Sequence, residues 1–308
     1  MTARVYTETA DPDLRPEDVP RRPAHGTALF VRPSHFQVLY RINPHMTGRA
    51  DPAVATEQWQ TVVDVYDDYA TDVEVLDPST LYEQTLRDGP KPAPAPERLP
   101  DMVFCANQSM PHPTEKRVLL SHMATRERMA EVEYLRAWYE SEGYAVEQLD
   151  TQATFEGMGD ALWYPGRELV VGGYGFRSER RAYEELSERF DVPVVMLKLT
   201  LEDCYHLDVC LSLLDEETAL LYPGALTDAG VETLQSLVDT VIEVPREEAI
   251  EGFACNAHSI DGQHVVLQRG NPETVRKLHD HGFEPIEVDT SEFMKAGGSV
   301  FCMKLMLP

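Results

Sequence analysis

Five polar residues recur along the chain at nearly constant spacing. They are Asn107, Glu156, His206, Asn256 and Cys302, and the intervals between them are 49, 50, 50 and 46 residues. A cysteine nucleophile needs a base and orienting groups from elsewhere in the chain, and histidine and glutamate commonly act as general acids and bases. Equivalent positions of a closed repeat meet on its axis. We therefore expect a central pocket that holds a cysteine among polar residues.

Each of these residues also has a simpler interpretation. Cys302 lies in the apolar run VFCMKL, where a buried structural thiol is common. A single histidine is often a satisfied core residue. Asn256, in FACNAHSI, can hold a turn, and we do not assign it to the site. The place of His206 on the same spacing as Glu156 and Cys302 favours a chemical role.

The elements that must position these residues follow the same period. Apolar residues at helical spacing predict helices over five segments, each followed by a short β-branched run that predicts a strand. The runs begin at 72, 144, 192, 240 and 283, so a period near 48 recurs, and the longer first interval contains the Pro-rich stretch 87–100, which we interpret as a surface loop. The predicted helices are 54–70, 126–142, 178–190, 227–239 and 272–281. This pattern predicts a fivefold array that closes into one domain.

The stretch CYHLDVC at 204–210 offers a second kind of site. As a strand it would place Cys204, His206, Asp208 and Cys210 on one face, and these are all zinc-ligand types. Zinc sites usually show paired CxxC or HxxxH spacings, and the chain has neither. We therefore predict no metal. We also predict no cofactor, because the sequence has neither a P-loop nor a GxGxxG between a strand and a helix.

Composition excludes several classes of function. The 308 residues include 53 acidic and 27 basic ones, a formal charge of −26, which argues against nucleic acid as a partner. No apolar run reaches the length of a membrane span, and MTARVYTETADPDLRPEDVP lacks the apolar core of a signal peptide. The five scattered cysteines are typical of a reducing compartment, so we predict a cytoplasmic protein, with self-association into a homo-oligomer left open.

Five segments resemble the amidinotransferase, arginine deiminase and dimethylargininase superfamily. They are DMVFCANQS (101–109), FEGMGDALW (155–163), GGYGFRS (172–178), HLDVCLS (206–212) and GGSVFCMKL (297–305). HFQVLYRINPHM (35–46) is similar to the arginine dihydrolase branch, and the charge resembles that of proteins from halophilic archaea. The resemblance implies a pentein, a five-bladed, pseudo-fivefold α/β propeller, as a single catalytic domain over 1–308 with 1–26 as an extended segment. It also implies that the last strand returns to the ring with Cys302.

The resemblance implies a role for each reactive residue. Cys302 attacks the guanidinium carbon as a thiolate and forms an amidino thioether, and the substrate cation lowers the pKa of the thiol. His206 protonates the departing amine and then activates water. Glu156 and Asp208 hold the planar guanidinium, for which paired carboxylates are suited.

Further residues match substrate-binding positions of the superfamily. Arg177 and Arg128 would hold the substrate α-carboxylate, although Arg128 could instead form an i,i+3 pair with Glu131 on a solvated helix face. Asn43 matches the dihydrolase branch. Asp160 has a structural and a substrate-binding interpretation of equal weight, because the sequence reads Glu-Gly-Met-Gly-Asp where deiminases usually have Glu-Gly-Gly-Asp.

Asn107 decides which reaction the sequence favours. Deiminases and dimethylargininases typically carry aspartate here, whereas asparagine resembles the dihydrolases. We therefore expect arginine as the small-molecule substrate, with ornithine, carbon dioxide and two ammonia as products. A deiminase or dimethylargininase that gives citrulline, and an amidinotransferase, are the nearest alternatives. A non-catalytic, ribosome-associated pentein is the alternative of a different class, but such proteins lack the Cys-His-Glu set.

Overall fold

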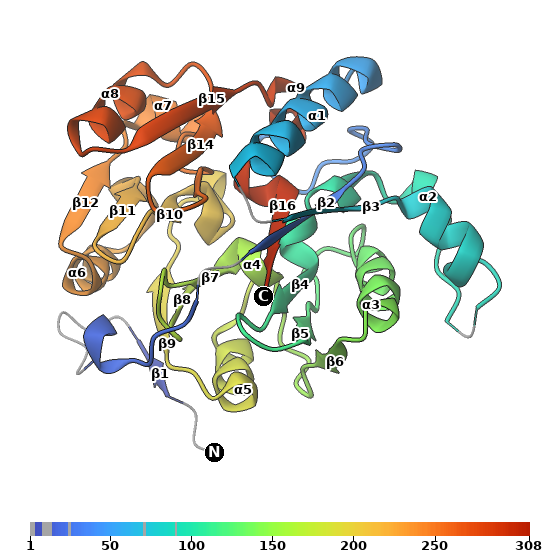
Figure 1. Cartoon of the computed structure of the whole chain (residues 1–308), viewed down its shortest axis with the longest axis horizontal. Helices are drawn as coiled ribbons and strands as arrows, with labels where there is room; N and C mark the ends of the chain where they lie inside the picture. Colours follow the sequence, from blue (N-terminus) through green and yellow to red (C-terminus); the bar gives the residue numbers. More distant parts are fainter. Residues whose placement is uncertain (1–3, 8–13, 24–25, 70–71, 90) are drawn as a thin grey trace.

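Five small sheets surround a common centre in the computed structural model, which describes residues 4–7, 14–23, 26–69, 72–89 and 91–308 (Figure 1). In each sheet the middle strand pairs antiparallel with an inner strand and parallel with an outer strand. Each sheet is one blade of a propeller. The predicted five-bladed α/β architecture is therefore confirmed.

Every blade contains an inner, a middle and an outer strand, in that order. They are β16 (Lys304–Leu307), β2 (Thr27–Val31) and β3 (Asp72–Leu76); β4 (Ser109–Pro111), β5 (Arg117–Leu120) and β6 (Ala145–Gln148); β7 (Ala161–Trp163), β8 (Val170–Tyr174) and β9 (Val194–Lys198); β10 (Leu211–Leu213), β11 (Thr218–Leu221) and β12 (Thr240–Glu243); and β13 (His258–Ser259), β14 (His264–Gln268) and β15 (Glu284–Val288). The five outer strands are the β-branched runs that the sequence predicted.

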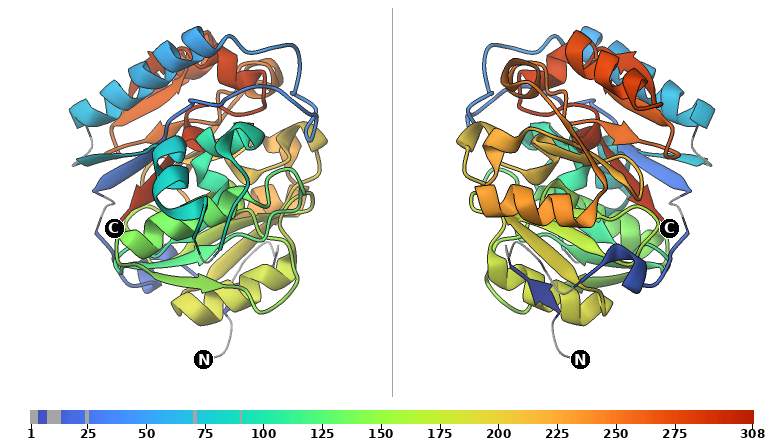
Figure 2. Two further views of the ribbon diagram at one scale, coloured as in Figure 1. Left: turned by 90° about the vertical axis from the view of Figure 1, so that its right-hand side faces the viewer. Right: turned by 90° about the vertical axis from the view of Figure 1, so that its left-hand side faces the viewer.

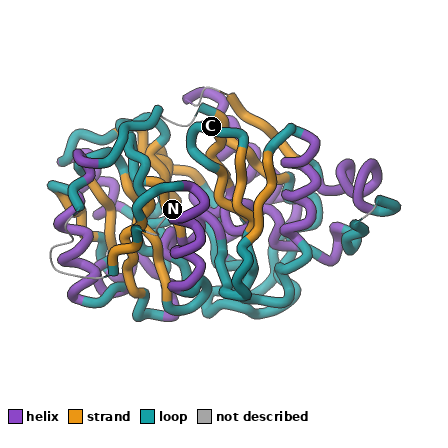
Figure 3. The backbone as a smooth tube through the Cα atoms, turned by 90° about the horizontal axis from the view of Figure 1, so that it is seen from below, coloured by secondary structure: helices purple, strands orange, loops and turns teal. Residues whose placement is uncertain are grey.

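One long helix joins the middle and outer strand of every blade and lies on the outside of the ring (Figure 1). These helices are α1 (Pro52–Tyr69), α3 (Glu131–Ser141), α5 (Arg180–Phe190), α6 (Asp228–Leu237) and α8 (Pro272–Asp280). A parallel strand pair requires such a crossover. Seen from below, strands and helices alternate across the molecule (Figure 3). All five predicted helices are observed, but α3 begins at Glu131 rather than at 126.

Short helices fill the connections. They are α2 (Pro78–Leu81), a π-helix at Tyr82–Leu86, α4 (Gly157–Asp160), α7 (Arg246–Ile250) and α9 (Ser291–Met294), with single 3₁₀ turns that include η1 (Pro16–Asp18), η3 (Pro96–Arg98) and η4 (Pro100–Val103). The described part of the Pro-rich stretch is largely an exposed loop as predicted, although Pro96, Leu99 and Pro100 are buried. No helix in the described ranges is long and apolar enough to cross a membrane.

The end of the chain closes the ring. β16 pairs antiparallel with β2, from Lys304 opposite Phe30 to Leu307 opposite Thr27. The two strands run side by side in both side views (Figure 2). Near the other end of the chain, β1 (Val5–Tyr6) adds a parallel fourth strand to β9. Within the predicted N-terminal segment 1–26, residues 1–3, 8–13 and 24–25 lie outside the described residues.

The prediction of a strand at CYHLDVC is wrong. The segment forms two 3₁₀ turns, η6 (Glu202–Cys204) and η7 (Leu207–Val209), so the alternation of a strand does not apply to its side chains. Across the described ranges, no three His, Cys, Asp or Glu side chains are grouped so that they could hold a metal ion.

Candidate active site

The five recurring polar residues lie at equivalent places in the propeller. Each sits in a short turn directly before the inner strand of a blade: Asn107 in η5 (Cys105–Gln108), Glu156 before α4, His206 before η7, Asn256 before β13 and Cys302 in η9 (Phe301–Met303). The inner strands surround the pseudo-fivefold axis, so the turns at their starts face one another. All five residues are buried.

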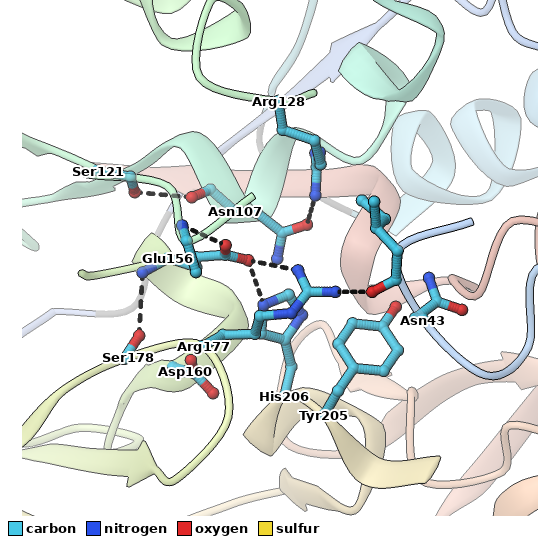
Figure 4. A network of polar contacts seen from close by, with 12 residues as sticks. Asn43, Asn107, Ser121, Arg128, Glu156, Asp160, Arg177, Ser178, Tyr205 and His206 are labelled. Carbon is cyan, nitrogen blue, oxygen red and sulfur yellow. Dashed lines mark hydrogen bonds and ion pairs between the residues drawn. The ribbon is translucent and has the colours of Figure 1, made fainter. Parts of the chain in front are cut away.

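Glu156 connects three parts of the site. Its Oε2 lies 2.6 Å from His206 Nε2 and accepts a hydrogen bond of 3.1 Å from Arg177 Nη1 (Figure 4). Its Oε1 accepts from the backbone N–H of Ala124 at 2.9 Å, and Ser178 Oγ accepts from the Glu156 N–H at 2.9 Å. The carboxylate therefore orients the imidazole of His206 directly.

The charge of Glu156 is stabilised despite its burial. Burial alone would raise the pKa of this carboxyl, but the hydrogen bond and charge of His206, and then the charges of Arg177 and Arg128, lower the pKa to about 2. Glu156 is thus ionised across the neutral range. A carboxylate that stays charged can hold the imidazole of His206 by a charge-assisted hydrogen bond.

Cys302 lies between Asp208 and Asn256. Its Sγ donates to Asp208 Oδ2 at 3.1 Å and accepts from Asn256 Nδ2 at 3.2 Å. Burial raises the pKa of the thiol well above its ordinary value, and the charge and hydrogen bond of Asp208 raise it further. Burial also raises the pKa of Asp208, to about 7. The site without a cationic ligand therefore favours a neutral thiol.

Asn107 is fixed in one orientation by Arg128. Arg128 Nη1 donates to Asn107 Oδ1 at 2.7 Å, and because guanidinium only donates, the amide oxygen must face it. The amide Nδ2 then points away from Arg128 (Figure 4). A Cβ added at Gly159 would lie 2.2 Å from this Nδ2 and 3.4 Å from the His206 ring. The Asn107 amide and the His206 imidazole therefore both lie close to Gly159.

Arg128 itself is held by four hydrogen bonds. Besides Asn107, it donates from Nε to Glu131 at 3.0 Å and from Nη2 to the carbonyls of Asp101 and Phe104 at 3.2 and 3.1 Å. The i,i+3 pair with Glu131 exists, but both side chains are buried, so the alternative of a solvated face is wrong. Most of its donors are used within the protein.

Arg177 binds two oxygen acceptors and lies against an aromatic ring. It donates from Nη1 to Glu156 and from Nη2 to the Ile42 carbonyl at 2.7 Å. Its guanidinium lies 4.8 Å from the centre of the Tyr205 ring (Figure 4). Tyr205, which the sequence analysis did not select, thus supports one side of this cation.

Asn43 and Asp160 contact mainly backbone. Asn43 Nδ2 donates to Ala296 O at 3.0 Å, and its Oδ1 accepts from the N–H groups of His45 and Met46 at 3.0 and 3.1 Å. Asp160 Oδ1 accepts from the Leu207 N–H at 3.0 Å, next to His206. Both side chains thus hold segments that carry other site residues.

Several buried polar atoms of the site have no hydrogen-bond partner among the described residues. They are Asn107 Nδ2, His206 Nδ1, Asp208 Oδ1, Asp160 Oδ2 and, next to Arg128, Asp101 Oδ1. Buried polar groups are nearly always paired in folded proteins, so such a group of atoms from several blades is typical of a polar binding site. Asp101 was not selected from the sequence; Tyr40 Oη donates to its Oδ2 at 2.9 Å.

Asn256 is the main residue that sequence reasoning omitted. Besides Cys302 Sγ, its Nδ2 donates to the Asp208 carbonyl at 3.0 Å, and its Oδ1 accepts from the N–H groups of Ser299 and Cys302 at 3.1 and 3.4 Å. It does tie down turns, as its sequence context indicated, but those turns carry Cys302. Its place in the 50-residue spacing was the signal that could have assigned it to the site.

Comparison with known proteins shows the family. The family model for eukaryotic N,N dimethylarginine dimethylhydrolases matches residues 93–307. The chain belongs to this family. It is 35% identical to N(G),N(G)-dimethylarginine dimethylaminohydrolase of Mycobacterium tuberculosis, over 92% of this chain and 87% of the relative. The family fold is the pentein, and the chain is a guanidino-group hydrolase.

Arginine dihydrolases are also similar to the chain. The bifunctional arginine dihydrolase/ornithine cyclodeaminase AgrE of Nostoc sp. is 31% identical over 90% of this chain, which spans only 37% of the relative's length. The crystal structure of the N-terminal domain of ArgZ, an arginine dihydrolase from Cyanobacteria with bound product, superposes with a TM-score of 0.82 at 31% identity, over 92% of this chain and 97% of that domain.

Proposed function

We propose that this guanidino-group hydrolase acts on arginine and releases ornithine, carbon dioxide and two ammonia. The observation that carries the proposal is the neutral Asn107 amide, fixed by Arg128 with its Nδ2 free in the site next to His206. The similarity to the dihydrolase domain supports it. The atoms of this reaction balance when two water molecules are consumed for each arginine.

The first half of the reaction uses the cation of the substrate. The guanidinium sits against the free Oδ1 of Asp208, and its charge favours loss of the proton from Cys302. The thiolate attacks the guanidinium carbon. His206, oriented by Glu156, gives a proton to the departing nitrogen, so ammonia leaves and an amidino thioether remains. His206 then takes a proton from water, which attacks the thioether carbon and forms citrulline as the sulfur leaves.

The second half requires a neutral ureido group to remain bound. A carboxylate at position 107 would repel the ureido oxygen, whereas the Asn107 Nδ2 can donate to it. Cys302 attacks the ureido carbon, a second ammonia leaves, and hydrolysis of the resulting thiocarbamate gives ornithine and carbon dioxide. Because Arg128 already occupies Asn107 Oδ1, we assign the donor and not the acceptor of the amide to this step.

The remaining predicted contacts divide into two roles. Arg177 binds the substrate α-carboxylate through the N–H groups that Glu156 and Ile42 leave free. Arg128, Asn43 and Asp160 act mainly as positioning residues, because their hydrogen bonds go to protein groups. Asp101, with one unpaired buried oxygen, is suited to the substrate α-ammonium.

Asn107→Asp tests the proposal. The wild-type protein should release two ammonia and ornithine for each arginine, and the variant should shift toward one ammonia and citrulline. Both products are counted after complete conversion of a limiting amount of arginine. Citrulline as the only wild-type product would overturn the dihydrolase proposal and leave the Cys302, His206 and Glu156 assignments intact.

Dimethylarginine hydrolysis is the second candidate, because the family match and the 35% identical relative carry that name. It predicts citrulline and dimethylamine from dimethylarginine. The two substrates should therefore be compared in the same assay. A kcat/KM for dimethylarginine that exceeds the value for arginine would favour this candidate.

A further inference from the structure

A second cavity, of about 270 Å³, opens at the end of the inner strands that lies away from the catalytic turns, where 165–166, 213–216 and 259–262 follow the strands. It reaches inward to Met158 and Phe301, in the turns that hold Glu156 and Cys302, and to Lys304 at the start of β16. Asp261 and Gly262 at its edge are exposed, so the cavity opens to solvent there. No step of the proposed mechanism uses this space.

Lys304 provides the cavity with a buried, unpaired amine. The residue is 1% exposed and lines the cavity. Nζ donates no hydrogen bond and forms no ion pair with any residue that the structure describes; its close contact is the Phe301 ring, whose centre is 3.5 Å away. A buried amine without an anionic partner is costly and therefore uncommon. Such a group at the inner end of a cavity is suited to an anion.

The rest of the cavity defines the shape of its occupant. The walls near Lys304 are apolar and include Met158, Trp163, Phe301 and Met306. The volume is slightly below the range of about 300–1,000 Å³ that is usual for ligand pockets, so the occupant is small.

Acidic side chains at the mouth do not prevent entry of an anion. Glu216 is paired with Arg21 and Arg167 at 2.8 and 2.9 Å, and Asp261 with His264 at 2.7 Å. Asp215 Oδ1 accepts from the Glu217 N–H at 2.8 Å. Most of the negative charge at the mouth is therefore balanced locally.

We propose that this cavity is a second binding site, for a small carboxylate with an apolar body whose carboxylate contacts Lys304 Nζ. The apolar body packs against Phe301, Trp163 and Met306. Phe301 directly precedes Cys302, and Lys304 follows it by two residues. The bound carboxylate thus lies behind the nucleophile, on the far side from the substrate.

Benzoate is the probe that tests the site, with benzyl alcohol as the uncharged molecule of the same shape. Calorimetric titration of the wild-type protein should show benzoate binding and at least about tenfold weaker binding of benzyl alcohol. Lys304→Met keeps the volume and removes the charge, and it should weaken benzoate binding at least about tenfold. Ile260→Trp, which fills the cavity from its partly exposed side without touching the amine, should weaken it as well.

Arg177→Met is the matched control, because the catalytic site also offers a cation. It should leave benzoate affinity unchanged. The proposal is overturned if benzoate does not bind, if Lys304→Met binds it as tightly as the wild type, or if Arg177→Met and not Lys304→Met loses it. The last outcome would place the carboxylate in the catalytic site. None of these results depends on which guanidino compound is the substrate.

Discussion

At the scale of single residues, Cys302 is the proposed nucleophile, and we expect its surroundings to keep it inactive until a substrate binds. Its hydrogen bond to Asp208 and its burial favour the thiol, whereas the Asn256 amide donates to the sulfur and would stabilise the thiolate. A bound guanidinium next to Asp208 would change this balance, since a cation favours ionisation of a thiol. The thiolate should therefore form mainly in the complex.

Replacement of Cys302 tests this role. Cys302→Ser should lower kcat below about 0.1% of the wild-type value, with a thermal unfolding midpoint within a few degrees, because the assigned role is chemical and hydroxyl is a far poorer nucleophile at this site. Cys204→Ala, at another buried free cysteine, is the control and should retain most of the activity. Substantial turnover by a folded Cys302→Ser protein would rule out the nucleophile assignment.

The sequence indicated the types of site residues more reliably than their contacts. Spacing and motifs selected Glu156, His206 and Cys302, which lie in equivalent turns. The bond from Arg128 to Asn107 could not be predicted, because the sequence suggested a helix over this segment, whereas Arg128 lies in a turn before α3 and is buried there. Asn256 could not be assigned to the site, because an asparagine that holds a turn and one that also contacts the sulfur of Cys302 look the same in sequence.

At the scale of elements, the turn Glu156–Asp160 is built around two glycines. Gly157 has φ +50°, and a Cβ there would lie 2.4 Å from the Ser109 carbonyl oxygen. Gly159 adopts an ordinary φ, but a Cβ there would lie 2.2 Å from the Asn107 amide nitrogen and 3.4 Å from the His206 ring. The inserted Met158 therefore extends the motif without moving Glu156 away from His206.

Gly159→Ala should separate activity from stability. The added methyl would collide with Asn107 Nδ2, and the hydrogen bond from Arg128 prevents this amide from turning aside. We therefore expect kcat to fall at least about tenfold, while the thermal unfolding midpoint changes only modestly. Met158→Leu, which conserves volume at the neighbouring position, should leave kcat within about twofold. Measurements of kcat and of the thermal unfolding midpoint for both variants check this prediction. A wild-type kcat in Gly159→Ala would show that the space between Gly159 and the Asn107 amide does not limit activity.

Strand β16 makes stability depend on pH through Lys304. Burial lowers the pKa of this amine from 10.5 to about 7, against smaller upward contributions from Cys105, Asp208 and Cys302. Between these values the unfolded chain binds a proton that the folded chain does not, so the free energy of unfolding should rise with pH, by at most about 1.4 kcal/mol per pH unit from this group.

Lys304→Met should remove that contribution. The variant should be more stable than the wild type at pH 7, and the difference should shrink steadily toward pH 10. Urea unfolding of both proteins at pH 7, 8, 9 and 10 measures this difference in the free energy of unfolding. A difference that does not change with pH would mean that Lys304 titrates normally in the folded protein.

At the scale of the whole molecule, the period near 48 residues was enough to predict a closed ring, because all five helix–strand pairs could be recognised. The inner strands are harder to predict from the sequence, because several have only two or three residues. The pattern CYHLDVC predicts a strand, although the segment forms the turns that precede one. Pairing of β16 with β2 joins segments about 275 residues apart, which local patterns cannot reveal. The predicted extent of the domain, 1–308, stays a prediction.

The charge of −26 leads to a prediction for the molecule as a whole. Helix α1 shows the distribution locally: its acidic residues Glu57, Asp64, Asp67 and Asp68 are exposed, and it contains no lysine or arginine. Repulsion among such charges destabilises the folded state. It is screened as the Debye length falls from about 10 Å at 0.1 M salt to about 3 Å at 1 M.

We therefore expect the free energy of unfolding to increase between 0.1 M and 1 M KCl, with activity retained at the higher concentration. The double variant Asp67→Asn/Asp68→Asn removes two adjacent charges from α1 and should reduce the dependence on salt. Chemical unfolding in urea, which adds no ions of its own, separates screening from denaturant effects. Greatest stability at 0.1 M KCl would show that repulsion does not limit the fold, and the resemblance in charge to halophilic proteins would then have no physical consequence here.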